Sequence, residues 1–247
     1  MNYRLLLVLV LIGCKHDEPL PAGRVTAEPG IDRCELTDIV TYSNTPADST
    51  VCHFSYNSSG QVSGITIFTP TSSSPYEHSW IYDWQKDAVY ITEGVIHIGP
   101  KLRYKCLRDN LGRITERFDP NATATQGTRY FFTYDSLNQL KTSARLINGT
   151  PSDTTYYIWQ NGDLIRDSLD HTVNNYTYYT NRLLQPGDGS LVSSWLDGWI
   201  PLFNPAHLTA SVPTSNGSIQ QSQYWFDSGG KIVSTDSGRN TFRYTCH

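Results

Sequence analysis

The chain has 247 residues and a formal net charge of -4 at pH 7, so it lacks the excess of Lys and Arg with which proteins bind nucleic acid or anionic lipid surfaces. It contains 16 Tyr, 6 Trp, 18 Gly and 13 Pro but only 1 Met, a composition typical of strands and turns. These numbers predict a β-rich protein that does not bind nucleic acid.

The amino terminus has the organisation of a signal peptide. Arg4 precedes an apolar run over residues 5–12, and the small residue Gly13 stands before Cys14. A membrane-spanning helix would need about 20 apolar residues, whereas a charged segment begins here at Lys15. A short basic region, an apolar stretch and a small residue at the cleavage site together favour a cleaved signal peptide over residues 1–13.

The segment Leu11-Ile12-Gly13-Cys14 resembles the processing box of bacterial lipoproteins. The resemblance implies cleavage before Cys14 and a diacylglycerol on its thiol, usually with a further acyl chain on the new amino group. Each buried methylene contributes about 0.8 kcal/mol, so two or more chains anchor a protein stably in a membrane. The alternative is an ordinary secretory signal that happens to be followed by a cysteine.

The residues after Cys14 give a second indication of location. Lys15-His16-Asp17-Glu18 resembles the acidic, Lys-containing signal with which Bacteroidetes-type lipoproteins reach the outer face of the outer membrane. The same residues would also suit a solvated spacer, because three prolines and two glycines interrupt residues 19–30,. We predict a lipidated amino terminus and flexible tether over residues 14–34, and a single β-barrel-like domain over residues 35–247.

Four cysteines remain once Cys14 is assigned to lipid: Cys34, Cys52, Cys106 and Cys246. Disulfides persist in the compartments outside the cytoplasm, so structural bridges among these four are favoured, with free buried thiols as the alternative. Four cysteines allow three connectivities, and the sequence does not choose among them. No pair has the CxxC spacing of a zinc site, and the sequence predicts neither a metal nor a cofactor.

A turn motif recurs along the chain. Four segments align without gaps: Tyr56–Val62, Arg108–Ile114, Tyr134–Leu140 and Phe226–Ile232. Asp or Asn at the second position can accept hydrogen bonds from the backbone two residues on, and Gly or Asn at the fifth position tolerates a positive φ. An aliphatic residue at the seventh position then begins a new strand, so each segment predicts a β-hairpin with a short loop.

The strands that enter the turns show a common alternation. Counting back by twos from the turns, and along the last strand, places these residues on one face: Cys52, Phe54, Tyr56, Tyr104, Cys106, Arg108, Tyr130, Phe132, Tyr134, Phe242, Tyr244 and Cys246,. Polar residues such as His53, Ser55 and Thr133 fall on the other face. One buried face and one wet face are typical of antiparallel sheets.

About fifteen such runs lie between residues 50 and 246. A long up-and-down meander exposes its edges unless it closes, so the predicted fold is an all-β antiparallel meander of about 12–16 strands, closing into a barrel or a strongly curled sheet. Arg113, Glu116 and Arg117 place charges on both faces of one strand, which opposes contact with lipid hydrocarbon. The expected architecture is therefore porin-like but surrounded by water.

The turn units, the segment Asn204-Pro205-Ala206-His207-Leu208 and the hairpin over Tyr224–Ile232 resemble Bacteroidetes-type lipoproteins of unknown function with porin-like β domains. The resemblance covers about residues 35–246 and implies an outer-membrane or surface lipoprotein. The turn units also resemble, more weakly, the YD repeats of RHS shell proteins, although they are fewer and irregularly spaced here. Neither family supplies catalytic residues for this chain.

Residues 181–206 do not continue the regular succession of strand and turn patterns, and they contain Trp195 and Trp199. Long insertions in compact domains are often functional, and the two indoles could stack on a sugar or peptide. Alternatively, this apolar segment covers one end of the barrel as a plug or lid. Five aspartates could in principle supply a carboxylate pair for glycoside cleavage: Asp119, Asp153, Asp163, Asp167 and Asp170.

Together these features predict a lipid-anchored cell-envelope protein at the outer membrane surface. The favoured interpretation is a ligand-binding module for a glycan, a peptide or another nutrient. The alternative is a structural or partner-docking subunit of an outer-membrane complex, and the second alternative is a glycoside-cleaving enzyme. No catalytic residue is predicted.

Overall fold

The structure is a computed structural model that describes residues 34–42, 49–69, 76–95, 99–123, 125–184, 195–196, 200–201, 205–213, 218–228, 230–235 and 240–246. The predicted signal peptide, the lipidation of Cys14 and most of the tether lie outside these residues. In the described part of the chain, no helix is long and apolar enough to cross a membrane.

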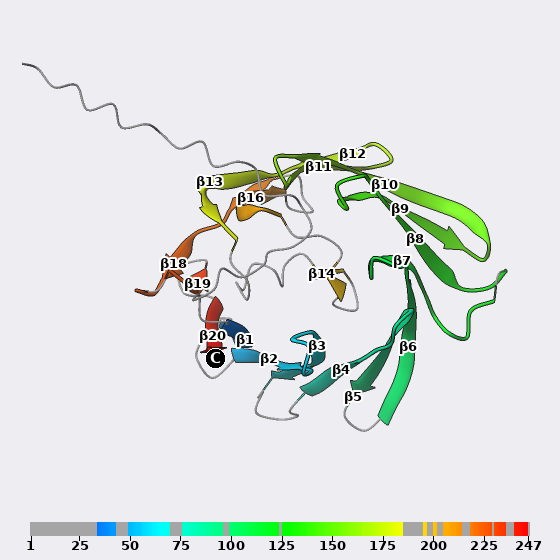
Figure 1. Cartoon of the computed structure of the whole chain (residues 1–247), viewed down its shortest axis with the longest axis horizontal. Helices are drawn as coiled ribbons and strands as arrows, with labels where there is room; N and C mark the ends of the chain where they lie inside the picture. Colours follow the sequence, from blue (N-terminus) through cyan, green and yellow to red (C-terminus); the bar gives the residue numbers. More distant parts are fainter. Residues whose placement is uncertain are drawn as a thin grey trace, which may run out of the picture.

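Fifteen strands form one antiparallel sheet (Figure 1). Twelve of them follow the chain: β1 (Cys34–Tyr42), β2 (Ser49–Tyr56), β3 (Val62–Thr69), β4 (Tyr76–Trp84), β5 (Ala88–Val95), β6 (Gly99–Arg108), β7 (Ile114–Phe118), β8 (Thr128–Tyr134), β9 (Leu140–Ile147), β10 (Thr150–Gln160), β11 (Asp163–Leu169) and β12 (Thr172–Asn175). The chain returns through β18 (Tyr224–Phe226), β19 (Ile232–Thr235) and β20 (Asn240–Cys246), and β20 pairs with β1. The predicted all-β antiparallel meander is thus confirmed.

Two smaller sheets accompany the main one. β13 (Thr177–Leu183), β16 (His207–Pro213) and β17 (Ile219–Gln221) form a three-stranded sheet, and β14 (Trp195–Leu196) pairs with β15 (Ile200–Pro201). Figure 1 places β13 and β16 between β18 and β11. The chain passes from the main sheet to the smaller one at Tyr176, between β12 and β13.

In the described part of the chain, the predicted closure into a barrel or a strongly curled sheet is not formed. The main sheet ends at β12 on one side and at β18 on the other, and these two strands do not pair with each other. Among the described residues, no further strand is added to the β12 edge, and a three-stranded sheet lies between the two ends. Single hydrogen bonds, such as Ala206 N–H to the Gly162 carbonyl at 3.0 Å, connect this sheet to the main one.

The core lies on one face of the main sheet, as the alternation predicted. Phe54, Cys106 and Phe132 are buried, and the other aromatic residues assigned to this face pack against them. The opposite face carries the polar residues, among which His53, Ser55 and Thr133 are exposed. Period-two alternation therefore assigned the buried and exposed sides of these strands correctly.

The turn chemistry is also confirmed. Asp109 Oδ1 accepts the N–H groups of Leu111 at 3.0 Å and Arg113 at 2.9 Å, and Asn57 and Asp135 make the equivalent pairs of bonds. At the fifth position, Gly112 has φ +80° and Asn138 has φ +64°. The positive φ explains why this position is Gly or Asn, since other side chains are strained in this conformation.

Aromatic residues near the ends of several strands have a role that the sequence did not reveal. Tyr134 Oη donates to the carbonyl of Ile114, and Trp159 Nε1 donates to the carbonyl of Leu140, both at 2.7 Å. Tyr56 and Trp84 make the same kind of bond to Leu36 and Val62 in the preceding strand, and Tyr224 bonds to Thr209 of β16. Each of these aromatic side chains thus ties its own strand to another strand.

We expect Tyr134→Phe to lower the free energy of unfolding by about 1 kcal/mol, because the ring keeps its packing while the Ile114 carbonyl loses its side-chain donor. Urea denaturation followed by circular dichroism measures this change. Tyr156→Phe is the matched control, since the Tyr156 side chain is exposed on the outer face and its hydroxyl can hydrogen-bond to water. Equal stability of the two variants would contradict a stabilising role for the hydrogen bond from Tyr134 to the Ile114 carbonyl.

Candidate functional site

The two tryptophans predicted as ligand platforms have side chains that lie outside the part of the chain that the structure describes. Trp195 lies in β14, but its side chain is outside what the structure describes, and Trp199 lies outside the described residues. Three of the five aspartates have different partners. Asp153 pairs with Arg145, Asp163 with His207, and Asp167 with Tyr176. Within the described ranges no three His, Cys, Asp or Glu side chains gather to hold a metal.

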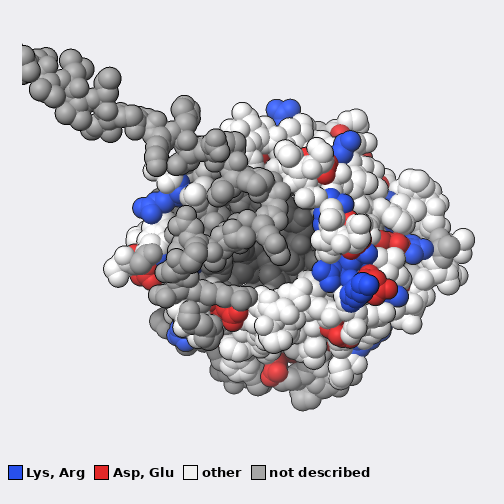
Figure 2. All heavy atoms as spheres, in the orientation of Figure 1, with Lys and Arg blue, Asp and Glu red and all other residues white. Residues whose placement is uncertain are grey.

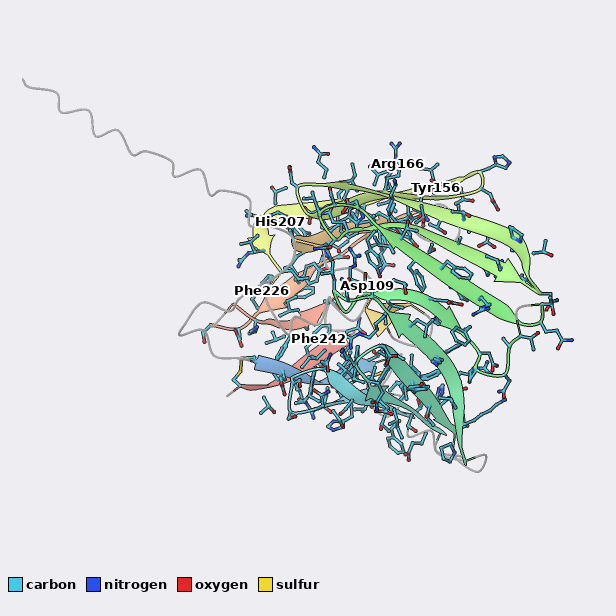
Figure 3. The ribbon with its side chains drawn as sticks, turned by 45° about the vertical axis from the view of Figure 1, so that its right-hand side comes forward. Asp109, Tyr156, Arg166, His207, Phe226 and Phe242 are labelled. Atoms are coloured by element: carbon cyan, nitrogen blue, oxygen red, sulfur yellow. A yellow bond between two sulfur atoms is a disulfide. The ribbon has the colours of Figure 1, made fainter. Side chains whose placement is uncertain are left out.

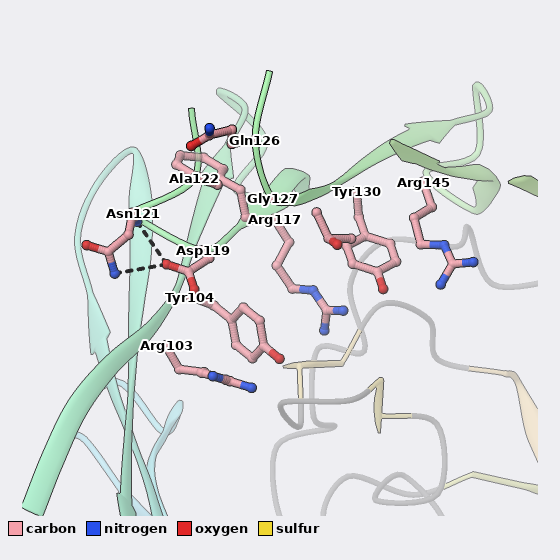
Figure 4. A pocket seen from close by; sticks show the side chains of 12 residues that line it. Arg103, Tyr104, Arg117, Asp119, Asn121, Ala122, Gln126, Gly127, Tyr130 and Arg145 are labelled. Atoms are coloured by element: carbon pink, nitrogen blue, oxygen red, sulfur yellow. Dashed lines mark hydrogen bonds between the residues drawn. The ribbon is translucent and has the colours of Figure 1, made fainter. Parts of the chain in front are cut away.

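A cavity of about 450 Å³ lies on the packed side of β6 to β9 (Figure 4). Its lining comprises Arg103, Tyr104, Arg117, Phe118, Asp119, Asn121, Ala122, Gln126, Gly127, Thr128, Tyr130 and Arg145. Figure 4 shows the side chains of Arg103, Arg117 and Arg145 extending toward the same side. On the face shown in Figure 2, Lys and Arg side chains gather in the region where Figure 1 places β7.

The strand register brings the charged and aromatic lining residues into one row. Arg117 in β7 lies opposite Cys106 in β6 and Tyr130 in β8. Tyr130 in turn lies opposite Arg145 in β9, and Arg145 lies opposite Asp153 in β10. Directly opposed residues of antiparallel strands share a face, so two arginines stand on the face that elsewhere forms the core.

Arg117 is the most buried of these arginines, with only 3% of its surface exposed. Its Cζ lies 4.8 Å from the ring centroid of Tyr104 and 4.4 Å from that of Tyr130. Desolvating a cation costs several kcal/mol, while each desolvated cation–π contact returns about 2 kcal/mol. The contacts with the two tyrosine rings therefore offset much of the free-energy cost of burying the charged guanidinium of Arg117.

Two ion pairs flank Arg117. Arg145 is bound to Asp153, with Nε to Oδ2 at 2.8 Å, and this hydrogen bond raises the pKa of Arg145. On the other side Arg103 Nε lies 3.5 Å from Glu93 Oε2, and a hydrogen bond with Tyr104 is the main cause that raises the pKa of Arg103. Both guanidinium groups therefore stay charged at every physiological pH.

Arg103 reaches the cavity because of a β-bulge. The register of β5 and β6 shifts between Ile91 and Thr92, so that Tyr104 lies opposite Ile91 and Leu102 opposite Thr92. Arg103 is the extra residue between these two pairs. An unpaired bulge residue is turned out of the regular alternation, which is why simple alternation did not identify Arg103 as a site residue.

The cysteines divide into a bridge and two thiols. Cys34 and Cys246 form a disulfide, whereas Cys52 and Cys106 are free. Burial raises the pKa of Cys52 to about 11 and that of Cys106 to about 12. Both remain protonated at neutral pH, and a thiol is a much weaker nucleophile than a thiolate. The prediction of bridges is thus confirmed for one pair, and the alternative of buried thiols holds for the other.

The comparisons with known proteins bear on the fold. No family model matches the chain, and no curated protein matches it. Among solved structures it is similar to a porin-like protein from Bacteroides uniformis, with a TM-score of 0.61 and 15% identity over 87% of this chain and 98% of that one. This neighbour has the fold that the resemblance to porin-like β domains implied.

The chain is also weakly similar to a toxin assembly that contains much longer chains. The Tc holotoxin pore of Photorhabdus luminescens matches with a TM-score of 0.30 and 13% identity over 75% of this chain. A TcdB2–TccC3 complex matches with a TM-score of 0.30 and 14% identity over 76% of this chain. In each case the match covers 12% of the other chain, and these TM-scores are too low to show a common fold.

Proposed function

We propose that the chain is a lipid-anchored protein of the outer membrane surface and binds a glycan, a peptide or another nutrient in the cavity between β6 and β9. The cavity carries the proposal, because aromatic faces and a few charged groups converge there, as they do in ligand sites. The Leu11-Ile12-Gly13-Cys14 box supports lipid anchorage. The Cys34–Cys246 disulfide is consistent with a place outside the cytoplasm,.

A docking role is the second candidate. Three apolar side chains, Tyr156, Ile158 and Val173, are exposed on β10 and β12. Register places Tyr156 and Val173 both opposite Ser168, so they share one face of the sheet. Figure 3 shows Tyr156 and Arg166 near each other on the outside of these strands. Apolar groups exposed together are a feature of surfaces that contact other proteins.

Binding is tested by titrating the full chain with a panel of oligosaccharides and short peptides and following the heat of binding. We expect at least one panel member to bind, and Asn121→Trp to weaken that binding about tenfold or more, because an indole at the rim of the cavity obstructs a ligand. Asn110→Trp is the matched control, since Asn110 is exposed in the β6–β7 turn.

Binding that is equally strong in both variants would place the ligand elsewhere on the molecule and contradict the cavity as the site. No binding across the panel, together with capture of an outer-membrane protein by the chain from native membranes, would instead favour the docking role.

A further inference from the structure

Positive charge predominates among the described residues that line the cavity. They include three arginines and one acidic residue, Asp119, which gives the described lining a formal charge of +2. Asp119 Oδ1 already accepts hydrogen bonds from Asn121 N at 2.8 Å and from Asn121 Nδ2 at 3.1 Å. Glu93 and Asp153 bind Arg103 and Arg145, but neither carboxylate is part of the lining.

The three guanidinium groups differ in how firmly they are held. Arg117 is fixed between two rings, and Arg145 is fixed by Asp153. The side chain of Arg103 is 43% exposed and its contact with Glu93 is long, at 3.5 Å. A guanidinium offers parallel N–H groups that match the two oxygens of a carboxylate. A rigid Arg117 beside an adjustable Arg103 is therefore suited to binding a carboxylate group.

The rest of the lining is suited to a sugar ring. Asn121, Gln126 and Thr128 supply amide and hydroxyl groups that can hydrogen-bond to sugar hydroxyls,. A cavity of about 450 Å³ is also much larger than an inorganic anion requires. We infer, on the basis of the proposed function, that the ligand is an acidic saccharide whose uronic carboxylate is bound by Arg117 and Arg103.

The test compares two saccharides that differ only in charge. The full chain is titrated calorimetrically with a trigalacturonate and with the neutral galactose trimer of the same linkage. We expect the acidic trimer to bind about tenfold more tightly, because its carboxylate gains charge-assisted hydrogen bonds. This preference should shrink as the salt concentration rises. A sulfated galactose trimer and a triglutamate peptide are titrated in parallel.

Substitutions locate the carboxylate. Arg103→Gln is expected to weaken binding of the acidic trimer about tenfold and to weaken binding of the neutral trimer much less. Arg166→Gln is the matched control, because Arg166 is exposed on the outer face of β11. Arg117→Gln should abolish the preference for acid entirely, and circular dichroism shows whether this buried variant folds. Arg103→Gln gives a result even if Arg117→Gln does not fold.

Each alternative outcome overturns the inference in a distinguishable way. Equal binding of the acidic and neutral trimers contradicts the inference but leaves the proposed function standing. Tighter binding of the triglutamate peptide or of the sulfated trimer assigns a different ligand class. An unchanged affinity in Arg103→Gln contradicts the assigned contact. Failure of every saccharide and peptide to bind overturns the proposed function and the inference together.

Discussion

Removing the Cys34–Cys246 disulfide is expected to lower the free energy of unfolding by about 5 kcal/mol, the value that chain-entropy theory gives for a loop of this length. The bond joins residues 212 apart in sequence, and it links the first residue of β1 to the last residue of β20. Without it, the unfolded chain gains nearly all the conformational freedom of an open chain. A domain is typically stable by 5–15 kcal/mol, so this would be a large loss.

The double variant Cys34→Ala/Cys246→Ala is compared with the parent protein by urea denaturation, with and without a thiol reductant. The reductant should destabilise the parent protein and leave the double variant unaffected, because Cys52 and Cys106 are already reduced. The dependence of the unfolding free energy on urea should increase, since an open chain exposes more surface when it unfolds. Identical unfolding midpoints for parent and double variant would show that the bridge contributes no stability.

The native strands should remain paired in that variant. β1 and β20 are paired from Cys34 opposite Cys246 to Thr41 opposite Asn240, with one register shift between Leu36 and Asp38. Leu36 is buried in the core, and Phe242 and Tyr244 pack against that core. We therefore attribute the expected loss mainly to the unfolded state, with fraying only at the ends of the two strands.

The pairing of Cys34 with Cys246 could not be predicted from the sequence, because it depends on the order of the strands in the sheet. The alternation placed Cys52, Cys106 and Cys246 on the buried face of their strands, but it gave no strand order. The run Cys34–Tyr42 was not predicted as a strand, although it is β1 and lies between β2 and β20. Only the pairing of β1 with β20 brings Cys34 to Cys246, and this pairing joins opposite ends of the chain.

The candidate site, too, could be predicted only in part from the sequence. Tyr104 and Tyr130 were correctly assigned to the packed face from alternation, because each lies an even number of residues from a turn. Arg117 was read as a charge that opposes lipid contact, and its position between those two rings depends on the register of β6, β7 and β8. One sequence signal could have indicated the buried position of Arg117: it lies in a strand between two strands that are rich in aromatic residues.

A buried hydrogen-bonded contact connects the main sheet to the three-stranded sheet. Asp163, at the start of β11, is only 5% exposed. Its Oδ1 accepts the backbone N–H of His207 at 2.9 Å, and its Oδ2 lies 2.7 Å from His207 Nδ1. The neighbouring Gly162 has φ +84°, and a Cβ there would lie 2.9 Å from the Ala206 side chain. The β10–β11 turn is therefore shaped to receive the start of β16.

Asp163→Ala is expected to lower the free energy of unfolding by about 3 kcal/mol, because it leaves two donors of His207 without their acceptor in a largely buried place. Asp163→Asn keeps the shape and one acceptor oxygen, so a loss of about 1 kcal/mol is expected. Asp83→Ala is the control, since Asp83 is exposed and surface substitutions change stability by less than about 0.5 kcal/mol.

Hydrogen exchange distinguishes a local effect of Asp163→Ala from a global one. The contact joins the three-stranded sheet to the main sheet, so the amides of β16 should exchange faster in the variant, while those of β3 to β9 keep their relative protection. Faster exchange throughout the main sheet, with no excess in β16, would mean that Asp163 stabilises the whole domain rather than the junction. Unchanged protection of β16 would show that the junction is held by backbone contacts such as Ala206 N–H to the Gly162 carbonyl.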